Sequence, residues 1–428
     1  MKARSILLLL VSATFFLHIG WMFYTGTFHM PLDGDEPDYR TIAHNLASGF
    51  GYMDANGPNV NRFPLYPIFL SFCELLFGPS PEVVRVLQAL MAALGVPLIW
   101  YIGTVAGPAG AGWLAALLYA VNPFVMHQTR FLMAETLTML LLLALGAVTM
   151  KCTHARSHVE QWILLLGIIC GLCLAARAQV VLSVLILVPW LCAVLRGRVP
   201  RFKVTLLVVA GILLVLSPWI ARNYLVYQQF IPFTSGKYAS AGGHVFWTTN
   251  NVLTASPGPD WGQWVHPTRL PEYAEYDAIP ASNPSLADRN GYEYGLRFLS
   301  SHPELIPGME IAKARIFWNY TWIMDAPGDL NMSVSVLVLV LVPFVLIGLL
   351  YEIQRPLLCL PFLAIVGAVF VSCLIYWGYA RFRVPIEPYM TLMLAFGLST
   401  LVTAFSRWRT HVYSPTRPLD RVRISRGR

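Results

Sequence analysis

Long apolar segments recur along almost the whole chain, and this feature limits the possible folds more than any other. A membrane-spanning helix needs about 20 apolar residues. Ten segments approach or reach that length: 5–25, 83–105, 110–128, 133–150, 161–178, 180–195, 204–220, 333–352, 357–378 and 386–405. Only 12% of the residues are charged, against about 25% in soluble proteins. The sequence therefore predicts an all-α polytopic membrane protein with about ten transmembrane helices.

The distribution of basic residues predicts the orientation of these helices, because basic residues concentrate in cytoplasmic loops. If the N-terminus is cytoplasmic, the segments on its side carry 16 basic and three acidic residues, and the rest of the chain carries 14 and 19. The net charge of +8 then reflects orientation and does not indicate nucleic-acid binding. The membrane domain covers 1–405, with external loops at 26–82 and 221–331. Residues 406–428 form a basic cytoplasmic tail that contacts anionic lipid.

Acidic residues crowd the start of the first external loop, and they are Asp33, Asp35, Glu36 and Asp38. After them, apolar residues at three- and four-residue spacing between Tyr39 and Phe50 predict a short amphipathic helix that lies flat on the membrane surface. One or two acids would suffice to cap this helix. Neighbouring carboxylates repel one another, and such groups are frequent at functional sites. Helix capping and function both remain open at this point.

A cation and a second short helix follow in the same loop. Arg62 either pairs with the acids or holds a phosphate, for which the planar guanidinium is well suited. Residues 68–77 are apolar but too short to span a bilayer. They predict a second surface or re-entrant helix.

These features form an ordered series that resembles the membrane glycosyltransferases of the GT-C type, in particular the protein O-mannosyltransferases and the lipid A aminoarabinose transferase. The series consists of Asp35-Glu36-x-x-Tyr39, then Arg62-x-Pro64-Leu-Tyr66, then Arg85. Arg62 stands where the family has lysine and Phe63 where it has a first proline. Later matches are Asn122-Pro123, Arg130, Glu135, Arg222-Asn223-Tyr224, Asp288-Arg289, His302-Pro303, Lys313 and Arg381-Phe-Arg383-x-Pro385-x-x-Pro388.

The resemblance implies that a sugar moves from a polyprenyl-phosphate donor to an acceptor outside the cytoplasm, by in-line displacement with inversion. A carboxylate must take the acceptor's proton, and cations must hold the phosphate leaving group. It implies Asp35 as the base, Glu36 as its support and Glu135 as a second acid. The implied substrate-binding residues are Asp33 (also a rival base), Tyr39, Arg62, Arg130, Arg222, Arg381 and Arg383.

Simpler structural roles remain open for several of these residues. Glu135 is also expected to form an ion pair with Arg130 near the membrane surface. Arginines at helix ends can also extend toward the interface without binding a ligand, and both alternatives hold for Arg177. The glycine-rich stretch around Lys237 and His244 predicts either a mobile lid or a simple turn.

The resemblance also implies partners and a location. The partners are a polyprenyl-phosphate sugar, a glycan, lipid or protein acceptor, and membrane lipids. The simple loops favour a bacterial inner membrane with the site facing the periplasm. We predict no cofactor, although the clustered carboxylates of the first loop could bind Mg²⁺ or Mn²⁺. The main alternative is a transporter or flippase, which would carry charged residues and broken helices near the bilayer midplane.

Overall fold

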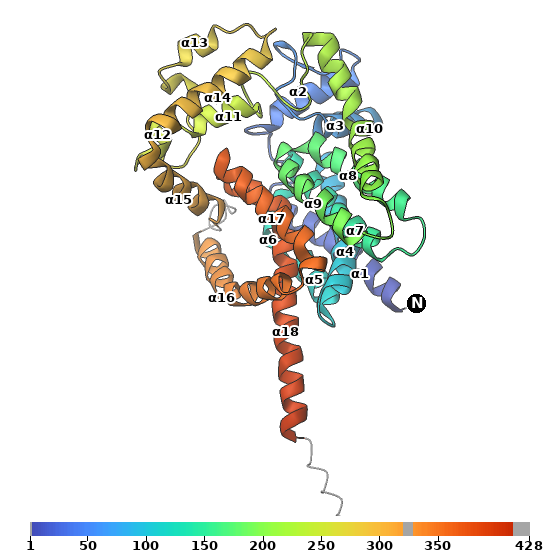
Figure 1. Ribbon diagram of the computed structural model, residues 1–428. Coiled ribbons are helices and arrows are strands. Elements are labelled where there is room, and N and C mark those ends of the chain that lie inside the picture. Colours follow the sequence, from blue (N-terminus) through green and yellow to red (C-terminus); the bar gives the residue numbers. More distant parts are fainter. Residues whose placement is uncertain (1, 320–327, 414–428) are drawn as a thin grey trace, which may run out of the picture.

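Helices form nearly all of the described structure, as the apolar segments predict (Figure 1). The computed structural model describes residues 2–319 and 328–413. Seven of the described helices are long and apolar enough to cross a membrane. They are α1 (Lys2–Tyr24), α4 (Pro81–Ala106), α7 (Ala134–His154), α8 (Val159–Ala176), α10 (Arg201–Tyr227), α17 (Pro356–Ile375) and α18 (Glu387–Tyr413). The predicted polytopic α-helical fold is confirmed.

Two of the predicted spans differ from what the structure contains. Residues 110–128 form two short helices, α5 (Ala111–Ala120) and α6 (Pro123–Gln128). The chain breaks between them because the side chain of Asn122 caps α6 and the Pro123 nitrogen has no hydrogen to donate. The span predicted at 180–195 is α9 (Val181–Val194), which directly continues the 3-10 turn η1 (Ala178–Val180). The combined apolar helix Ala178–Val194 is shorter than the seven candidate spans, and it lies at the lower limit of about 17 residues for crossing a bilayer.

The last helices extend beyond their predicted bounds. α16 (Gly328–Ile353) packs along α18. α18 continues to Tyr413, so the predicted tail begins as helix. Residues 414–428 of that tail lie outside the described residues, as do residues 320–327 of the second external loop.

Close backbone contacts hold the bundle together, and glycines make them possible. A Cβ added at Gly167 of α8 would lie 2.5 Å from the Val208 carbonyl oxygen of α10, and one at Gly211 of α10 would lie 2.5 Å from the Ile168 nitrogen. Small residues at such crossings are typical of membrane helix packing. A core of buried side chains, among them Leu142, Ile163 and Tyr389, continues from α4 to α18.

The first external loop folds into α2 (Glu36–Ala47), a two-stranded hairpin of β1 (Met53–Asp54) and β2 (Gly57–Pro58), and α3 (Leu65–Phe77). The predicted amphipathic helix is α2, but its apolar residues Tyr39, Ile42 and Ala43 are buried against protein, including α3. The apolar face of this helix therefore packs on protein, and its predicted position on the membrane surface stays a prediction. α3 instead exposes a run of large apolar side chains at its end, namely Phe72, Leu75, Leu76 and Phe77.

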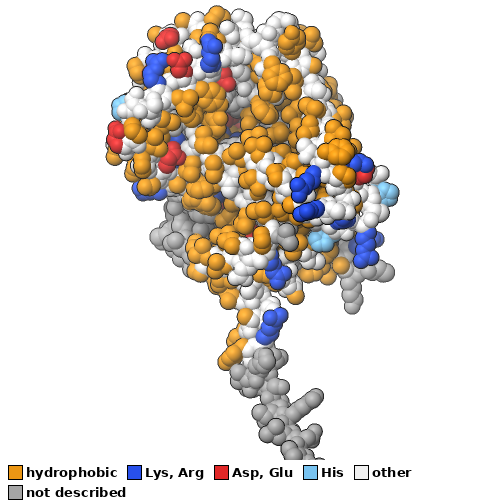
Figure 2. Space-filling view, viewed as in Figure 1, with side chains coloured by type: hydrophobic (Ala, Val, Ile, Leu, Met, Phe, Trp, Pro, Cys, Tyr) orange, Lys and Arg blue, Asp and Glu red, His pale blue; other side chains and the backbone are white. Residues whose placement is uncertain are grey.

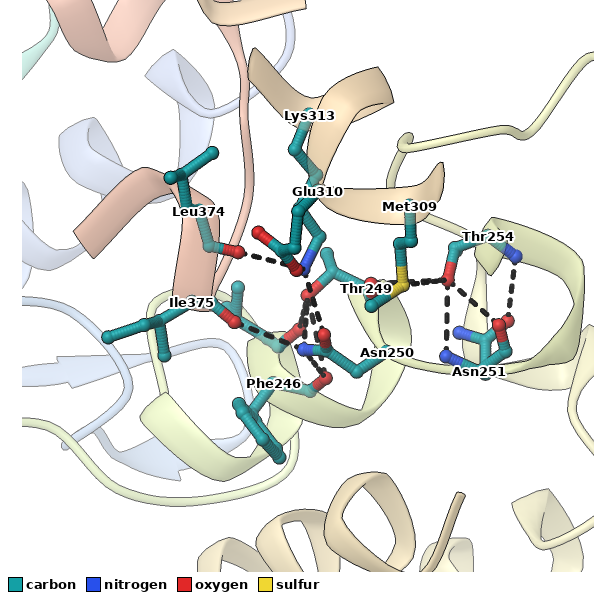
Figure 3. Close-up of polar contacts among 11 residues, drawn as sticks. Phe246, Thr249, Asn250, Asn251, Thr254, Met309, Glu310, Lys313, Leu374 and Ile375 are labelled. Atoms are coloured by element: carbon teal, nitrogen blue, oxygen red, sulfur yellow. Dashed lines mark hydrogen bonds and ion pairs between the residues drawn. The ribbon is translucent and has the colours of Figure 1, made fainter. Parts of the chain in front are cut away.

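The second external loop contains α11 (Gly242–Thr249), α12 (Val252–Ala255), α13 (Tyr273–Asp277), α14 (Pro284–Ser301) and α15 (Ile306–Phe317), with the 3-10 turns η2 (Pro267–Arg269) and η3 (Pro303–Leu305). A buried network ties it to the bundle (Figure 3). The ammonium of Lys313 donates to Asn250 Oδ1 at 2.8 Å and to the Leu374 carbonyl of α17 at 2.8 Å, and it pairs with Glu310 at 3.1 Å. Lys313 is therefore a structural anchor between α15, α11 and α17.

The two external loops lie together at one end of the molecule. Helices α2, α3 and α11–α14 gather there, whereas the N-terminus and the end of α18 lie toward the opposite end (Figure 1). Hydrophobic side chains cover most of the middle of the molecule, and Lys and Arg side chains recur around its lower part (Figure 2). The orientation predicted from the basic residues stays a prediction.

Candidate functional site

A large cavity opens where the two external loops meet the ends of the helices. Its volume is about 880 Å³, and it is lined by residues from both loops and from the segments after α8 and α17. One part of its wall is charged, with Asp35, Arg62 and Arg381. Another part is apolar and includes Val181, Leu182 and Phe233. A cavity of this kind suits a ligand with a charged and an apolar part.

Asp35 connects two arginines at the charged wall. It is the residue before α2, and its two carboxylate oxygens accept hydrogen bonds from Arg62 Nη2 and Arg381 Nη2, each at 2.8 Å. Burial alone would raise the pKa of Asp35, but the two guanidinium groups outweigh it and hold the pKa well below its usual range. Asp35 is therefore ionised, and it is a weak base as long as both arginines contact it.

These contacts belong to a longer row of alternating charges. Arg62 Nη2 also donates to Asp38 at 2.7 Å, Arg381 Nε lies 3.0 Å from Glu135 Oε1, and Arg177 Nη2 pairs with the same Glu135 oxygen. We call this row the charge ladder, and its members in order are Asp38, Arg62, Asp35, Arg381, Glu135 and Arg177.

The charge ladder is assembled from distant parts of the sequence. Its residues come from the start of α2, the loop before α3, the first turn of α7, the residue after α8 and the 3-10 turn η4 (Ala380–Ile386). Glu135 is fully buried, and its second oxygen has no hydrogen-bond partner in the described part of the chain. Because three carboxylates face three guanidinium groups, the ladder is neutral overall, and its arginines are held in place before any ligand arrives.

Tyr39 supports the ladder from α2. Its buried ring lines the cavity, and the guanidinium carbon of Arg62 lies 4.9 Å from the ring centre. The aromatic face stabilises the cation and fixes its position.

Glu36 points away from the ladder although it neighbours Asp35 in the sequence. Its oxygens accept hydrogen bonds from the backbone nitrogens of Leu132 at 2.6 Å and Asp33 at 2.9 Å. Burial raises the pKa of Glu36, although these hydrogen bonds oppose the shift. Glu36 thus joins the first external loop to the turn before α7.

The other predicted site residues lie outside the cavity lining. Asp33 is exposed and accepts a hydrogen bond from the Gly34 nitrogen. Arg130 contacts His127 and the ring of Phe131. Glu135, which was expected to pair with Arg130 if it were structural, pairs with Arg177 and Arg381 instead.

Arg222 and Arg383 bind backbone groups and also lie outside this lining. Arg222 donates to the Asn59 carbonyl at 2.8 Å and so ties α10 to the first external loop. Arg383 is fully buried, pairs with Glu387 at 2.7 Å and donates to the Phe317 carbonyl at 2.7 Å.

Several cavity residues were not among the predicted site residues. Tyr292 and Tyr376 had no role in the sequence prediction. Attention had been drawn to Asp38, Arg177, His244 and Asp288 without placing them in the site. Arg177 carried a usable signal, because a charge inside a long apolar stretch is expensive unless it has a partner. Among the described residues, no group of three or more His, Cys, Asp or Glu side chains could hold a metal ion. The prediction that the chain needs no cofactor stays a prediction.

The helical bundle and the two external loops define a polytopic membrane protein with the fold of the GT-C type membrane glycosyltransferases. Residues 58–221 match the family described as dolichyl-phosphate-mannose-protein mannosyltransferase. This match confirms the resemblance to the protein O-mannosyltransferases. Among curated proteins, none matches the chain in sequence.

Solved structures share this fold at low sequence identity. The oligosaccharyltransferase of Archaeoglobus fulgidus in the apo form has a TM-score of 0.56 at 14% identity, over 96% of this chain and 52% of its own. The oligosaccharyltransferase AglB of the same organism, in complex with an inhibitory peptide and a dolichol-phosphate, has a TM-score of 0.57 at 13% identity, over 98% and 52%. ArnT of Cupriavidus metallidurans, bound to undecaprenyl phosphate, has a TM-score of 0.45 at 15% identity, over 96% and 79%. The chain spans about half the length of these oligosaccharyltransferases.

Proposed function

We propose that this protein transfers a sugar from a polyprenyl-phosphate carrier to an acceptor on the non-cytoplasmic face of the membrane. The observation that carries the proposal is the meeting of three arginines and an apolar wall in one cavity. A polyprenyl-phosphate sugar has the matching parts, because its phosphate is anionic and its tail is apolar. The dolichol-phosphate in the AglB complex is a ligand of this chemical class.

The ladder suggests how the phosphate binds. Arg62, Arg381 and Arg177 already hold their positions through Asp35, Glu135 and Asp38, so little reorganisation is needed when an anion arrives. The phosphate takes over hydrogen bonds that Asp35 accepts in the free protein. Loss of those bonds and the nearby negative charge both raise the pKa of Asp35. Donor binding would thus convert Asp35 from a weak base into a usable one.

The transfer step then follows from these positions. The acceptor hydroxyl oxygen attacks the anomeric carbon of the donor sugar, and its proton passes to the Asp35 carboxylate. The bond between the anomeric carbon and the phosphate oxygen breaks, and its electron pair stays on the phosphate. Attack from the opposite face inverts the configuration. The arginines stabilise the charge that grows on the phosphate, and Glu135 holds Arg381 and Arg177 for that task.

The basic residues and the family resemblance support a cellular setting that belongs to the same proposal. The chain lies in a bacterial inner membrane, with the cavity open to the periplasm. The sugar is a hexose or a pentose, and the carboxylate base works without a metal ion.

A transfer assay tests the proposal. The purified protein is placed in phosphatidylcholine nanodiscs and incubated with radiolabelled polyprenyl-phosphate sugars and a membrane extract as the acceptor source. Label should move to an acceptor, and Asp35→Asn should slow this transfer by about 10²–10⁴-fold, the usual contribution of a general base. Asp33→Asn is the matched control, because Asp33 is exposed and lies outside the cavity lining.

Each result has a distinct meaning. Full transfer by Asp35→Asn would keep the enzyme class and move the base to another carboxylate. If wild-type protein neither binds nor consumes any donor of a broad panel, the transferase proposal is wrong and a transporter becomes the better explanation.

A further inference from the structure

A second group of polar side chains faces the same cavity away from the charge ladder. It consists of His244 on α11, Asp288 and Tyr292 on α14, and Tyr376 after α17. The mechanism above uses none of them.

The backbone holds this group in a fixed geometry. The Gly243 nitrogen donates to Asp288 Oδ1 at 2.6 Å. A Cβ added at Gly291 of α14 would lie 2.4 Å from the Gly243 carbonyl oxygen, so α11 and α14 touch through their backbones. His244 and Asp288 therefore keep their relative positions without a ligand.

His244 has unused hydrogen-bonding capacity. Its side chain is only 2% exposed, and its Nδ1 has no hydrogen-bond partner within residues 2–319 and 328–413. The ring is stacked at 5.9 Å on Tyr276 and lies 5.7 Å from Tyr238. Burial lowers the pKa of His244 to about 4, so the ring is neutral near pH 7. A buried polar atom without a partner is costly, and a ligand hydroxyl in the cavity would satisfy it.

The charges at this end oppose an anionic ligand. Asp288 lines the cavity here. The basic residues of the lining are Arg62, Arg177 and Arg381, and all three belong to the charge ladder. Burial raises the pKa of Asp288 to about 6, although the hydrogen bond from Gly243 opposes the shift. Asp288 is thus still mainly ionised near pH 7 and accepts hydrogen bonds from hydroxyl groups.

Aromatic side chains connect this end to the ladder. The hydroxyls of Tyr292 and Tyr376 lie 2.9 Å apart. The next residue, Trp377, is stacked on Tyr379 at 4.7 Å, and Arg381 lies 5.7 Å from the Tyr379 ring centre. Aromatic faces of this kind provide flat apolar contact next to polar groups.

We infer that His244, Asp288, Tyr292 and Tyr376 bind the acceptor, and that the acceptor presents a neutral, hydroxyl-rich ring such as a sugar residue of a glycan. A sugar ring uses the carboxylate, the imidazole nitrogen and the phenol hydroxyls together, and its carbon face covers an aromatic ring. An ammonium group would use Asp288 but leave His244 unsatisfied. This inference rests on the proposed function, because it gives the second substrate of that reaction a place in the same cavity.

Saturation-transfer NMR with methyl α-D-mannopyranoside as the probe tests the inference, on the full chain in phosphatidylcholine nanodiscs. Wild-type protein should transfer saturation to the ring protons of the probe. Asp288→Asn and His244→Phe should each reduce the signal at least about fivefold, the equivalent of one hydrogen bond of about 1 kcal/mol. Phe keeps the stacking of the histidine ring, and Asn can still accept from Gly243.

The matched control is Glu293→Gln, next to Tyr292 on α14. Glu293 is exposed, its pair with Arg297 is at the surface, and it is not among the cavity lining. This variant should bind the probe as wild type does. Undecaprenyl phosphate binding is measured on every sample, and Asp288→Asn and His244→Phe should retain it, which also shows that they are folded.

The outcomes separate the inference from the proposed function. Unchanged sugar binding in Asp288→Asn and His244→Phe overturns the inference, and so does a wild-type protein that ignores the sugar but binds a serine-containing peptide. Failure of the wild-type protein to bind undecaprenyl phosphate while it still binds the sugar overturns the proposed function and leaves the acceptor site standing.

Discussion

The two ends of the cavity prepare for a ligand in opposite ways. At the charge ladder each arginine is already paired with a carboxylate, and an incoming phosphate must replace internal bonds. At the other end His244 Nδ1 has no hydrogen-bond partner in the described structure. A ligand can therefore bond to this atom without replacing an internal hydrogen bond.

This difference has consequences for substitutions. Ladder residues stabilise the protein and bind the donor at once, because a buried charge without its partner is strongly unfavourable. His244 at the other end can be changed with a smaller effect on folding, because its Nδ1 makes no hydrogen bond within the described structure. The two ends should therefore respond differently to the same kind of variant.

The largest effect is expected for Arg381→Ala. This change leaves Asp35 with one arginine and the fully buried Glu135 with Arg177 alone. Removing one partner of a buried pair typically costs about 3–5 kcal/mol. We expect a much lower midpoint of thermal unfolding in detergent and no detectable undecaprenyl phosphate binding. Arg297→Ala, at an exposed pair on α14, should change stability by about 0–1 kcal/mol. Equal effects of the two variants would show that the buried pairs of Arg381 stabilise the protein no more than an exposed pair does.

A smaller loss of stability is expected for Glu36→Gln. Both oxygens of Glu36 accept backbone N–H groups, and an amide offers one oxygen and one NH₂ group. One backbone donor is left without an acceptor, which costs about 1–3 kcal/mol. Thermal unfolding should detect this loss, whereas the transfer rate per folded molecule should stay close to wild type. A low rate in fully folded Glu36→Gln would assign Glu36 a role in the reaction itself.

The sequence predicted the helices of the bundle better than the pairing of its charges. Apolar length alone identifies most of the spans, because a bilayer sets a minimum length for each. It failed at 110–128, where Asn122 and Pro123 divide one apolar run into two helices. The acidic start of the first loop pointed to a site. The side chains of Asp35 and Glu36 point in different directions, however, and these directions depend on backbone angles that cannot be read from the residue types.

Long-range partners were the least accessible part of the site. Glu135 was expected near Arg130, five residues away, yet its partners are 42 and 246 residues distant in the sequence. Arg222 and Arg383 resembled phosphate ligands by position, and the structure instead shows them bound to backbone carbonyls. Such choices depend on which helices pack together, and residue spacing does not contain that information.

A pH change should affect the two ends unequally. The pKa of Asp288 is raised to about 6, so Asp288 loses its charge as the pH falls from 7.5 to 5. A hydrogen bond to a charged group is worth about 1 kcal/mol more than one to a neutral group, so the affinity for methyl α-D-mannopyranoside should fall about fivefold over this range. His244, with a pKa of about 4, stays mainly neutral above pH 5. In Asp288→Asn the affinity should be low and independent of pH, and a pH dependence that survives in this variant would point to another group.

The smallest effect is expected for Arg62→Lys, at the position where the O-mannosyltransferases are expected to carry lysine. Both hydrogen bonds from Arg62 to Asp35 and Asp38 come from the single nitrogen Nη2, and its buried Nε has no hydrogen-bond partner in the described part of the chain. The guanidinium therefore acts toward these carboxylates as a point charge, which an ammonium can replace. Undecaprenyl phosphate affinity should fall no more than about threefold, under 1 kcal/mol. Arg62→Gln, which removes the charge, should weaken binding much more. If Arg62→Lys weakens binding as much as Arg62→Gln, then the phosphate accepts two parallel hydrogen bonds from the guanidinium of Arg62. The single-nitrogen contacts to Asp35 and Asp38 in the free protein would then differ from those to the donor.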